Sequence, residues 1–117
     1  GADPMKVVAA ISGPEPQRSI FEAEVARRLI ESGERALILE GKPDEPKESQ
    51  IDQLKVVHHM GDKRLAEALV SADLIIARSG YSTIMDLDAL GVNNVEYHPT
   101  PGQTEQEYLA RLHGPKL

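Results

Sequence analysis

The chain has 117 residues, which suits a single domain and is long enough to bury a core. It carries 13 Lys and Arg against 19 Asp and Glu, so its formal net charge is −6, and only 3% of its residues are aromatic. Nucleic-acid binding is therefore not expected, because it needs a basic stripe for phosphates or aromatic platforms for bases. The absence of cysteine excludes disulfides, thiolate zinc sites and thiol catalysis.

No apolar run approaches the ~20 residues of a membrane span, and no signal peptide is visible, so we expect a cytoplasmic protein. The residues GADP (1–4), which precede Met5, are interpreted as an expression-vector remnant. We expect residues 5–117 to form a single domain, because no repeat and no change in composition divides them.

The first part of the chain alternates apolar runs with helical periodicity. A β-branched run at 6–12 stops at Gly-Pro and predicts a buried strand. A helix is expected over 14–33, with prolines at its start and a glycine at its end. A second strand is expected at 35–41. The polar, proline-containing stretch 42–53 is expected to be a loop and the most mobile part of the chain.

The second part of the chain continues this alternation. Residues 54–60 predict a weaker strand, and residues 62–72 predict a helix with Asp62 as its N-cap. The apolar run at 73–77 predicts a further strand. The remaining expected elements are, in order, a helix at 82–91 that ends at Gly91, a poor strand at 92–98 and an amphipathic helix at 104–112.

This order of elements predicts an α/β fold, namely a Rossmann-like, doubly wound parallel sheet of about five strands with helices on both faces. Right-handed crossovers put the first and fourth expected strands side by side, where the winding reverses. The turns that follow them, SGPEPQRS (12–19) and RSGYST (78–83), then open onto one crevice at the carboxyl edge of the sheet. Open α/β sheets bind ligands in such crevices.

The turn SGYST (79–83) has two interpretations. Gly80 allows a close backbone approach, and the hydroxyls of Ser82 and Thr83 stand at a helix start, where free amides and the helix dipole favour a phosphate. Alternatively, Ser82 or Thr83 simply caps the helix, because Thr83 and Asp86 have the capping-box spacing. From the pattern and its place at the switch point, both interpretations stay open.

Two further segments carry candidate binding groups. In SGPEPQRS, Gly13 stands between a strand and a helix start, and Arg18 either pairs with a phosphate or is a solvated first-turn residue. The segment matches neither GxGxxG nor GxxxxGKS. In PTPGQTEQE (99–107), amides and carboxylates suit the hydroxyls of a sugar, although a capping box at the helix start is the simpler interpretation. The polar residues are Gln103, Thr104, Glu105, Gln106 and Glu107.

Catalytic and metal-binding signatures are not recognised. The four histidines lack ligand spacing and have no carboxylate cluster beside them, so no metal is expected. No nucleophile elbow, triad or carboxylate pair is present either, so the catalytic residues are unknown and a general base is expected outside this chain.

The stretches ADLIIARSGYSTIMDLDALG (72–91) and PTPGQTEQEYLA (99–110) resemble the C-terminal, nucleotide-sugar-binding half of GT-B glycosyltransferases. The nearest group is the one that contains the bacterial UDP-N-acetylglucosamine transferase of lipid II synthesis. SGPEPQRSIFE (12–22) resembles the first βα turn of that half in related predicted glycosyltransferases. The resemblance covers most of residues 6–112 and is loose at 41–60.

The resemblance implies the role of each part of a UDP-sugar donor site. Gly13 and its neighbours would approach the diphosphate, the helix start would bind the phosphates, and Asp86 matches the acidic position that holds the ribose, where the family usually has the longer Glu. The segment from Met60 to Leu65 would flank the uracil. The expected donor-binding residues are Gly13, Arg18, Met60, Leu65, Ser79, Gly80, Tyr81, Ser82, Thr83, Asp86, Gln103, Thr104, Glu105 and Gln106.

The resemblance also implies metal-independent transfer without a cofactor, in which the helix dipole and amides stabilise the departing nucleotide diphosphate. The base and the acceptor site would belong to an N-terminal acceptor domain or a separate acceptor subunit, so the chain alone is expected to be inactive. Any membrane contact would run through that missing half. The alternatives are a nucleotide-sugar hydrolase on the same scaffold and a non-catalytic interaction module that has lost the donor site.

Two features depart from the family. Glu96 and His98 stand in VEYHP where aliphatic residues are common, and polar groups there would be destabilising if the strand were buried. The chain also stops at Leu117, where the family continues with further elements. It is therefore expected to be either truncated or one subunit of a split enzyme.

Overall fold

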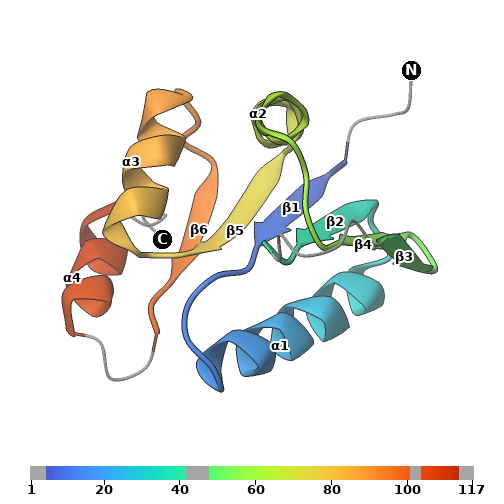
Figure 1. Ribbon diagram of the computed structural model, residues 1–117, viewed down its shortest axis with the longest axis horizontal. Helices are drawn as coiled ribbons and strands as arrows, with labels where there is room; N and C mark the ends of the chain where they lie inside the picture. The colour runs from blue at the N-terminus through green and yellow to red at the C-terminus, as the bar shows by residue number, and fades with distance from the viewer. Residues whose placement is uncertain (1–4, 42–47, 101–103, 114–117) are drawn as a thin grey trace.

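The computed structural model describes residues 5–41, 48–100 and 104–113. The strands are β1 (Val7–Ala10), β2 (Ala36–Leu39), β3 (Glu48–Ile51), β4 (Leu54–Val57), β5 (Leu74–Arg78) and β6 (Val95–His98). The helices are α1 (Gln17–Ser32), α2 (Asp62–Ser71), α3 (Tyr81–Ala89) and α4 (Thr104–His113). Figure 1 shows a twisted sheet with α1 on one face and α2 and α3 on the other. No helix in these ranges has the length and apolar character needed to cross a membrane.

The strands form a six-stranded sheet in the order β3-β4-β2-β1-β5-β6. All neighbouring pairs are parallel except β3 and β4, which are antiparallel. The α/β class and the pairing of the first expected strand with the fourth, here β1 with β5, are confirmed. This pairing follows because a right-handed crossover takes the chain from β1 outward to β2 and β4, and the return crossover brings β5 back beside β1.

Two expectations are wrong. The sheet is not purely parallel, because β3 pairs with β4 in the antiparallel direction. The stretch 42–53 is not a loop throughout, because β3 lies within it. All four residues of β3, Glu48–Ile51, are exposed, and a tight turn at Asp52, with φ of 53°, leads directly into β4. Apolar periodicity does not reveal such a strand, since its hydrogen bonds to β4 hold it in place without burying an apolar face. Residues 42–47 lie outside the described residues.

The sheet is apolar on both faces. Val7 and Ala9 of β1 pack with Val25 and Leu29 of α1, whereas Val8, between them, packs with Leu69 of α2 on the opposite face. Because successive side chains of a strand alternate between the faces, a strand covered on both sides has no polar positions. This explains the continuous apolar runs of β1, of β2 and of β5 as far as Ala77.

Glycines stand at the end of α1 and at the starts of α2 and α3, and none of these three helices has a side-chain cap at its start. α1 ends at Gly33, whose φ of 71° suits glycine. α2 begins at Asp62 with Gly61 as its N-cap, and no side chain caps it, so the prediction of Asp62 as the N-cap is wrong. Asp62 lies instead in the first turn, where its carboxylate interacts favourably with the helix dipole.

The charge of Glu96 in β6 is accommodated at the edge of the sheet. Glu96 is half-buried, and its carboxylate lies 2.9 Å from Arg28 Nη1 of α1 and 3.4 Å from His98 Nε2. The cost of an unpaired polar group in a core therefore does not arise at Glu96.

Asn94 fastens the start of β6 to the end of α2. Its Nδ2 donates hydrogen bonds to the carbonyl oxygens of Ala72, at 2.7 Å, and Asp73, at 2.8 Å. Ala72 is buried, so an unmade bond to its carbonyl is costly.

We predict that Asn94→Ala lowers the free energy of unfolding by about 1–3 kcal/mol, because it leaves these carbonyl oxygens without their amide donor. Urea denaturation followed by circular dichroism measures the change. Asn93→Ala is the matched control, since Asn93 is exposed and its removal is expected to cost less than about 0.5 kcal/mol. Equal losses for the two variants would contradict this role of Asn94.

Candidate functional site

Three chain segments meet at the carboxyl edge of the sheet. The ends of β1 and β5 are adjacent, with Ala10 in register with Ala77, so the turns that follow them begin side by side. Gly13, in the turn after β1, has φ of +107°, a conformation that favours glycine. A Cβ placed on it would lie 3.9 Å from Thr100 Oγ1, in the segment after β6. The expected crevice loops are thus neighbours, and the segment after β6 joins them.

The start of α1 is largely satisfied by the chain itself. The amide of Arg18 donates to the Pro14 carbonyl oxygen at 3.0 Å, and the amide of Ser19 donates to Glu15 Oε1 at 2.9 Å. The hydroxyl of Ser19 also donates to Glu15 Oε2 at 2.7 Å. The Glu15 carboxylate therefore occupies the position at which a helix start attracts an anion.

The start of α3 is different. α3 begins at Tyr81, its N-cap is Gly80 in an extended conformation, and no side chain forms a cap hydrogen bond. The interpretation of Ser82 or Thr83 as the cap, with Asp86 closing a capping box, is therefore wrong, because the chain passes directly from β5 into the helix at Gly80. Amides in the first turn of a helix without a side-chain cap are the groups that a phosphate binds.

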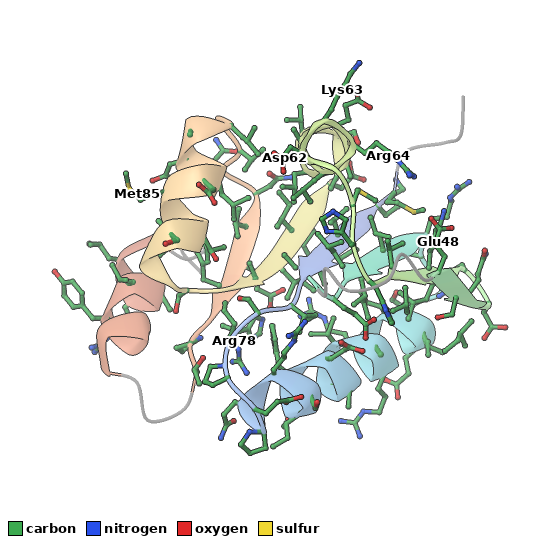
Figure 2. The ribbon with its side chains drawn as sticks, in the orientation of Figure 1. Glu48, Asp62, Lys63, Arg64, Arg78 and Met85 are labelled. Carbon is green, nitrogen blue, oxygen red and sulfur yellow. The ribbon has the colours of Figure 1, made fainter. Side chains whose placement is uncertain are left out.

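Arg78, the last residue of β5, lies among the three segments. Its side chain is 6% exposed. Its Nη1 donates to the carbonyl oxygens of Pro99, at 2.9 Å, and His98, at 3.4 Å, and its Nη2 donates to Gln17 at 3.2 Å. The guanidinium carbon lies 4.0 Å from the centre of the Phe21 ring, a cation–π contact. Arg78 thus ties the start of α1 to the end of β6 (Figure 2).

The pKa of Arg78 is lowered by burial, and the charge of Glu24 opposes this effect.

A second cluster lies at the ends of β2 and β4. Glu40 follows β2 and has a side chain that is 8% exposed, and its Oε1 lies 2.9 Å from Nε2 of His58, which follows β4. Arg18 donates from Nη2 to the Glu40 carbonyl oxygen. The structure thus turns Arg18, a predicted phosphate partner, toward the end of β2. Sequence reasoning did not single out Glu40, because a charged residue at the end of an apolar run gives no signal that it is buried.

A groove with a volume of about 360 Å³ runs between α2 and α3. Leu69 is buried at its base, and the carboxylates of Asp62 and Asp86 are exposed along it. The groove brings together Leu65 and Asp86, which were expected at the uracil and the ribose. Met60, the other expected uracil neighbour, packs against the core on this face. Figure 2 shows Asp62 at the start of α2, beside this groove.

The remaining expected site residues are placed as follows. Ser79 is fully buried, Gly80 and Thr83 are half-buried, and Ser82 is exposed. Gln103 lies outside the described residues, as do the side chains of Tyr81, Thr104, Glu105 and Gln106, although α4 does begin at Thr104. Within the described ranges, no three His, Asp or Glu side chains gather as metal ligands.

A cavity of about 390 Å³ lies away from this edge, beside the β3–β4 hairpin. It is lined by Met5, Arg35, Gln50, Gln53 and Lys55. Its polar groups already serve the fold, since Gln53 donates to the Leu29 carbonyl oxygen and Lys55 pairs with Glu48. The carboxyl edge and the α2–α3 groove are therefore the better candidates for a site.

We predict that His58→Ala lowers the free energy of unfolding by about 1–3 kcal/mol, because the buried Glu40 carboxylate loses its imidazole partner. His59→Ala is the matched control, since the adjacent His59 is exposed and its loss is expected to cost less than about 0.5 kcal/mol. Chemical denaturation of both variants at one pH measures the difference. A His58 variant as stable as the wild type would show that Glu40 does not depend on the imidazole.

No protein-family model, no curated protein and no solved structure matches this chain. The features that bear on function are therefore the carboxyl edge of the sheet, the α2–α3 groove and the sequence motifs that lie there.

Proposed function

We propose that the chain binds the nucleoside diphosphate of a UDP-sugar, as the Rossmann-like donor half of a GT-B glycosyltransferase. The observation that carries the proposal is the α2–α3 groove. Leu65 and Asp86 are 21 positions apart in the sequence (86 − 65), were assigned to the base and the ribose separately, and line the same groove. Its apolar base suits the face of a pyrimidine, and the exposed carboxylate suits a ribose diol, since an ionised carboxylate accepts hydrogen bonds from both hydroxyls.

The position of the phosphates is supported by the helix starts. Asp86 lies on α3, the helix whose first turn is the proposed phosphate-binding group. The first turn of α3 has no side-chain cap, and its amides carry the positive end of the helix dipole. The turn after β1, with Gly13, adjoins this position through the pairing of β1 with β5. The starts of α1 and α3 thus contribute unequally to phosphate binding. The start of α3 is the stronger, because Glu15 already neutralises the start of α1.

The chemistry that follows is stabilisation of the leaving group. When the bond between the anomeric carbon and the phosphate oxygen breaks, negative charge builds on the nucleotide diphosphate. Amides of the α3 start that are already oriented lower the energy of that charge without reorganisation. The acceptor hydroxyl and the base that deprotonates it come from a second domain or subunit, in keeping with the motif resemblance.

We predict that the protein binds UDP saturably and that Asp86→Ala weakens this binding by about tenfold or more, because two ribose hydroxyls lose a charged acceptor. Isothermal titration calorimetry measures the dissociation constants. Asp88→Ala is the matched control: it removes the same charge from an exposed position of α3 that does not line the groove.

The proposal fails if the folded protein shows no heat of binding at millimolar UDP. Equal weakening by the Asp86 and Asp88 variants would show that net charge, and not a ribose contact, is responsible.

A further inference from the structure

We propose that Arg78 supplies a fixed, buried positive charge that makes the carboxyl edge of the sheet an anion site, and that this charge holds the diphosphate. This inference rests on the proposed function and assigns its cation. Sequence reasoning left Arg78 out of the donor site, although it stands at the head of the RSGYST turn.

The surroundings of Arg78 hold it in place, and the charge of the exposed Glu24 raises its pKa although the two side chains form no ion pair. Its guanidinium contacts three backbone carbonyl oxygens and the Phe21 ring, which are all uncharged. In the part of the chain that the structure describes, no carboxylate forms an ion pair with it, and its Nε is buried without a hydrogen-bond partner. A buried cation that forms no ion pair is costly, so it is expected where a bound anion completes the pair.

The location of Arg78 fits a diphosphate. It is two residues before Gly80, the N-cap of α3, and its Nη2 contacts Gln17, the first residue of α1. The start of α3, which has no side-chain cap, therefore lies close to the guanidinium in sequence, whereas the start of α1 that Arg78 contacts is already occupied by the Glu15 carboxylate. In a chain with a net charge of −6, a diphosphate would otherwise be repelled, and a fixed cation in low dielectric reverses the local potential.

The competing explanation is that Arg78 only ties α1 to the end of β6. A structural link between α1 and β6 needs the several planar N–H donors of the guanidinium, whereas an anion site needs its positive charge. Lysine keeps the charge but loses this arrangement of donors. The test therefore compares Arg78→Lys with Arg78→Gln, using inorganic pyrophosphate, UDP and uridine as separate probes. Arg28→Gln is the control, because Arg28 is a half-exposed arginine that pairs with Glu96.

We expect Arg78→Gln to weaken pyrophosphate and UDP binding by at least about tenfold, which corresponds to about 1.4 kcal/mol, and to leave uridine binding within about twofold. Arg78→Lys is expected to keep pyrophosphate binding within about threefold even where it lowers thermal stability. If Lys and Gln weaken pyrophosphate equally, or if Gln leaves it unchanged, the charge is not the determinant and the inference is overturned.

A measurement on the wild-type protein covers the case in which an Arg78 variant does not fold. The Arg78 Nε–H resonance is expected to shift on saturation with pyrophosphate, while that of Arg28 stays in place. Pyrophosphate binding without a shift at Arg78 overturns the inference but not the proposed function. Absence of UDP binding to the wild-type protein removes both.

Discussion

The parallel pairing of β1 with β5 is the constraint on which the rest of this structure depends. It places Ala10 beside Ala77, so the turns after the two strands emerge together and the starts of α1 and α3 share one edge of the sheet. The core follows from the same pairing, because central strands covered on both faces are apolar throughout. The outer strands β3 and β6 can then carry charged residues, since each has a single neighbour in the sheet.

The starts of α1 and α3 at that edge differ in how strongly they can attract an anion. An acidic chain has little to attract an anion except fixed dipoles and individual cations. At α1 the Glu15 carboxylate already takes the favourable position, whereas at α3 the N-cap is a glycine and no side-chain cap hydrogen bond forms. Arg78 lies between them, bound by carbonyl oxygens and an aromatic ring. The proposed site is therefore asymmetric, and the proposal places the phosphates on the α3 side.

Sequence reasoning reached the α/β class and the pairing of β1 with β5, because these follow from periodicity and the handedness of crossovers. It missed β3, which is exposed along its whole length and is held by backbone hydrogen bonds that leave no apolar pattern. It also placed the caps of α2 and α3 on side chains, although in both helices the N-cap is a glycine in an extended conformation. Glu40 and Arg78 gave no signal because burial of a charged residue depends on distant partners.

The sequence by itself determined the alternation of strands and helices, the positions of the crevice loops and the chemical types available there, because these properties are local and periodic. Only the tertiary structure decided which groups are already occupied. The Glu15 carboxylate accepts a hydrogen bond at the start of α1, and His58 pairs with Glu40. Arg78 donates its hydrogen bonds to carbonyl oxygens and forms no ion pair with a carboxylate among the described residues. Such pairings join residues that are up to 61 positions apart, as Arg78 and Gln17 are, and no local pattern encodes a contact set by the crossing of strands and helices.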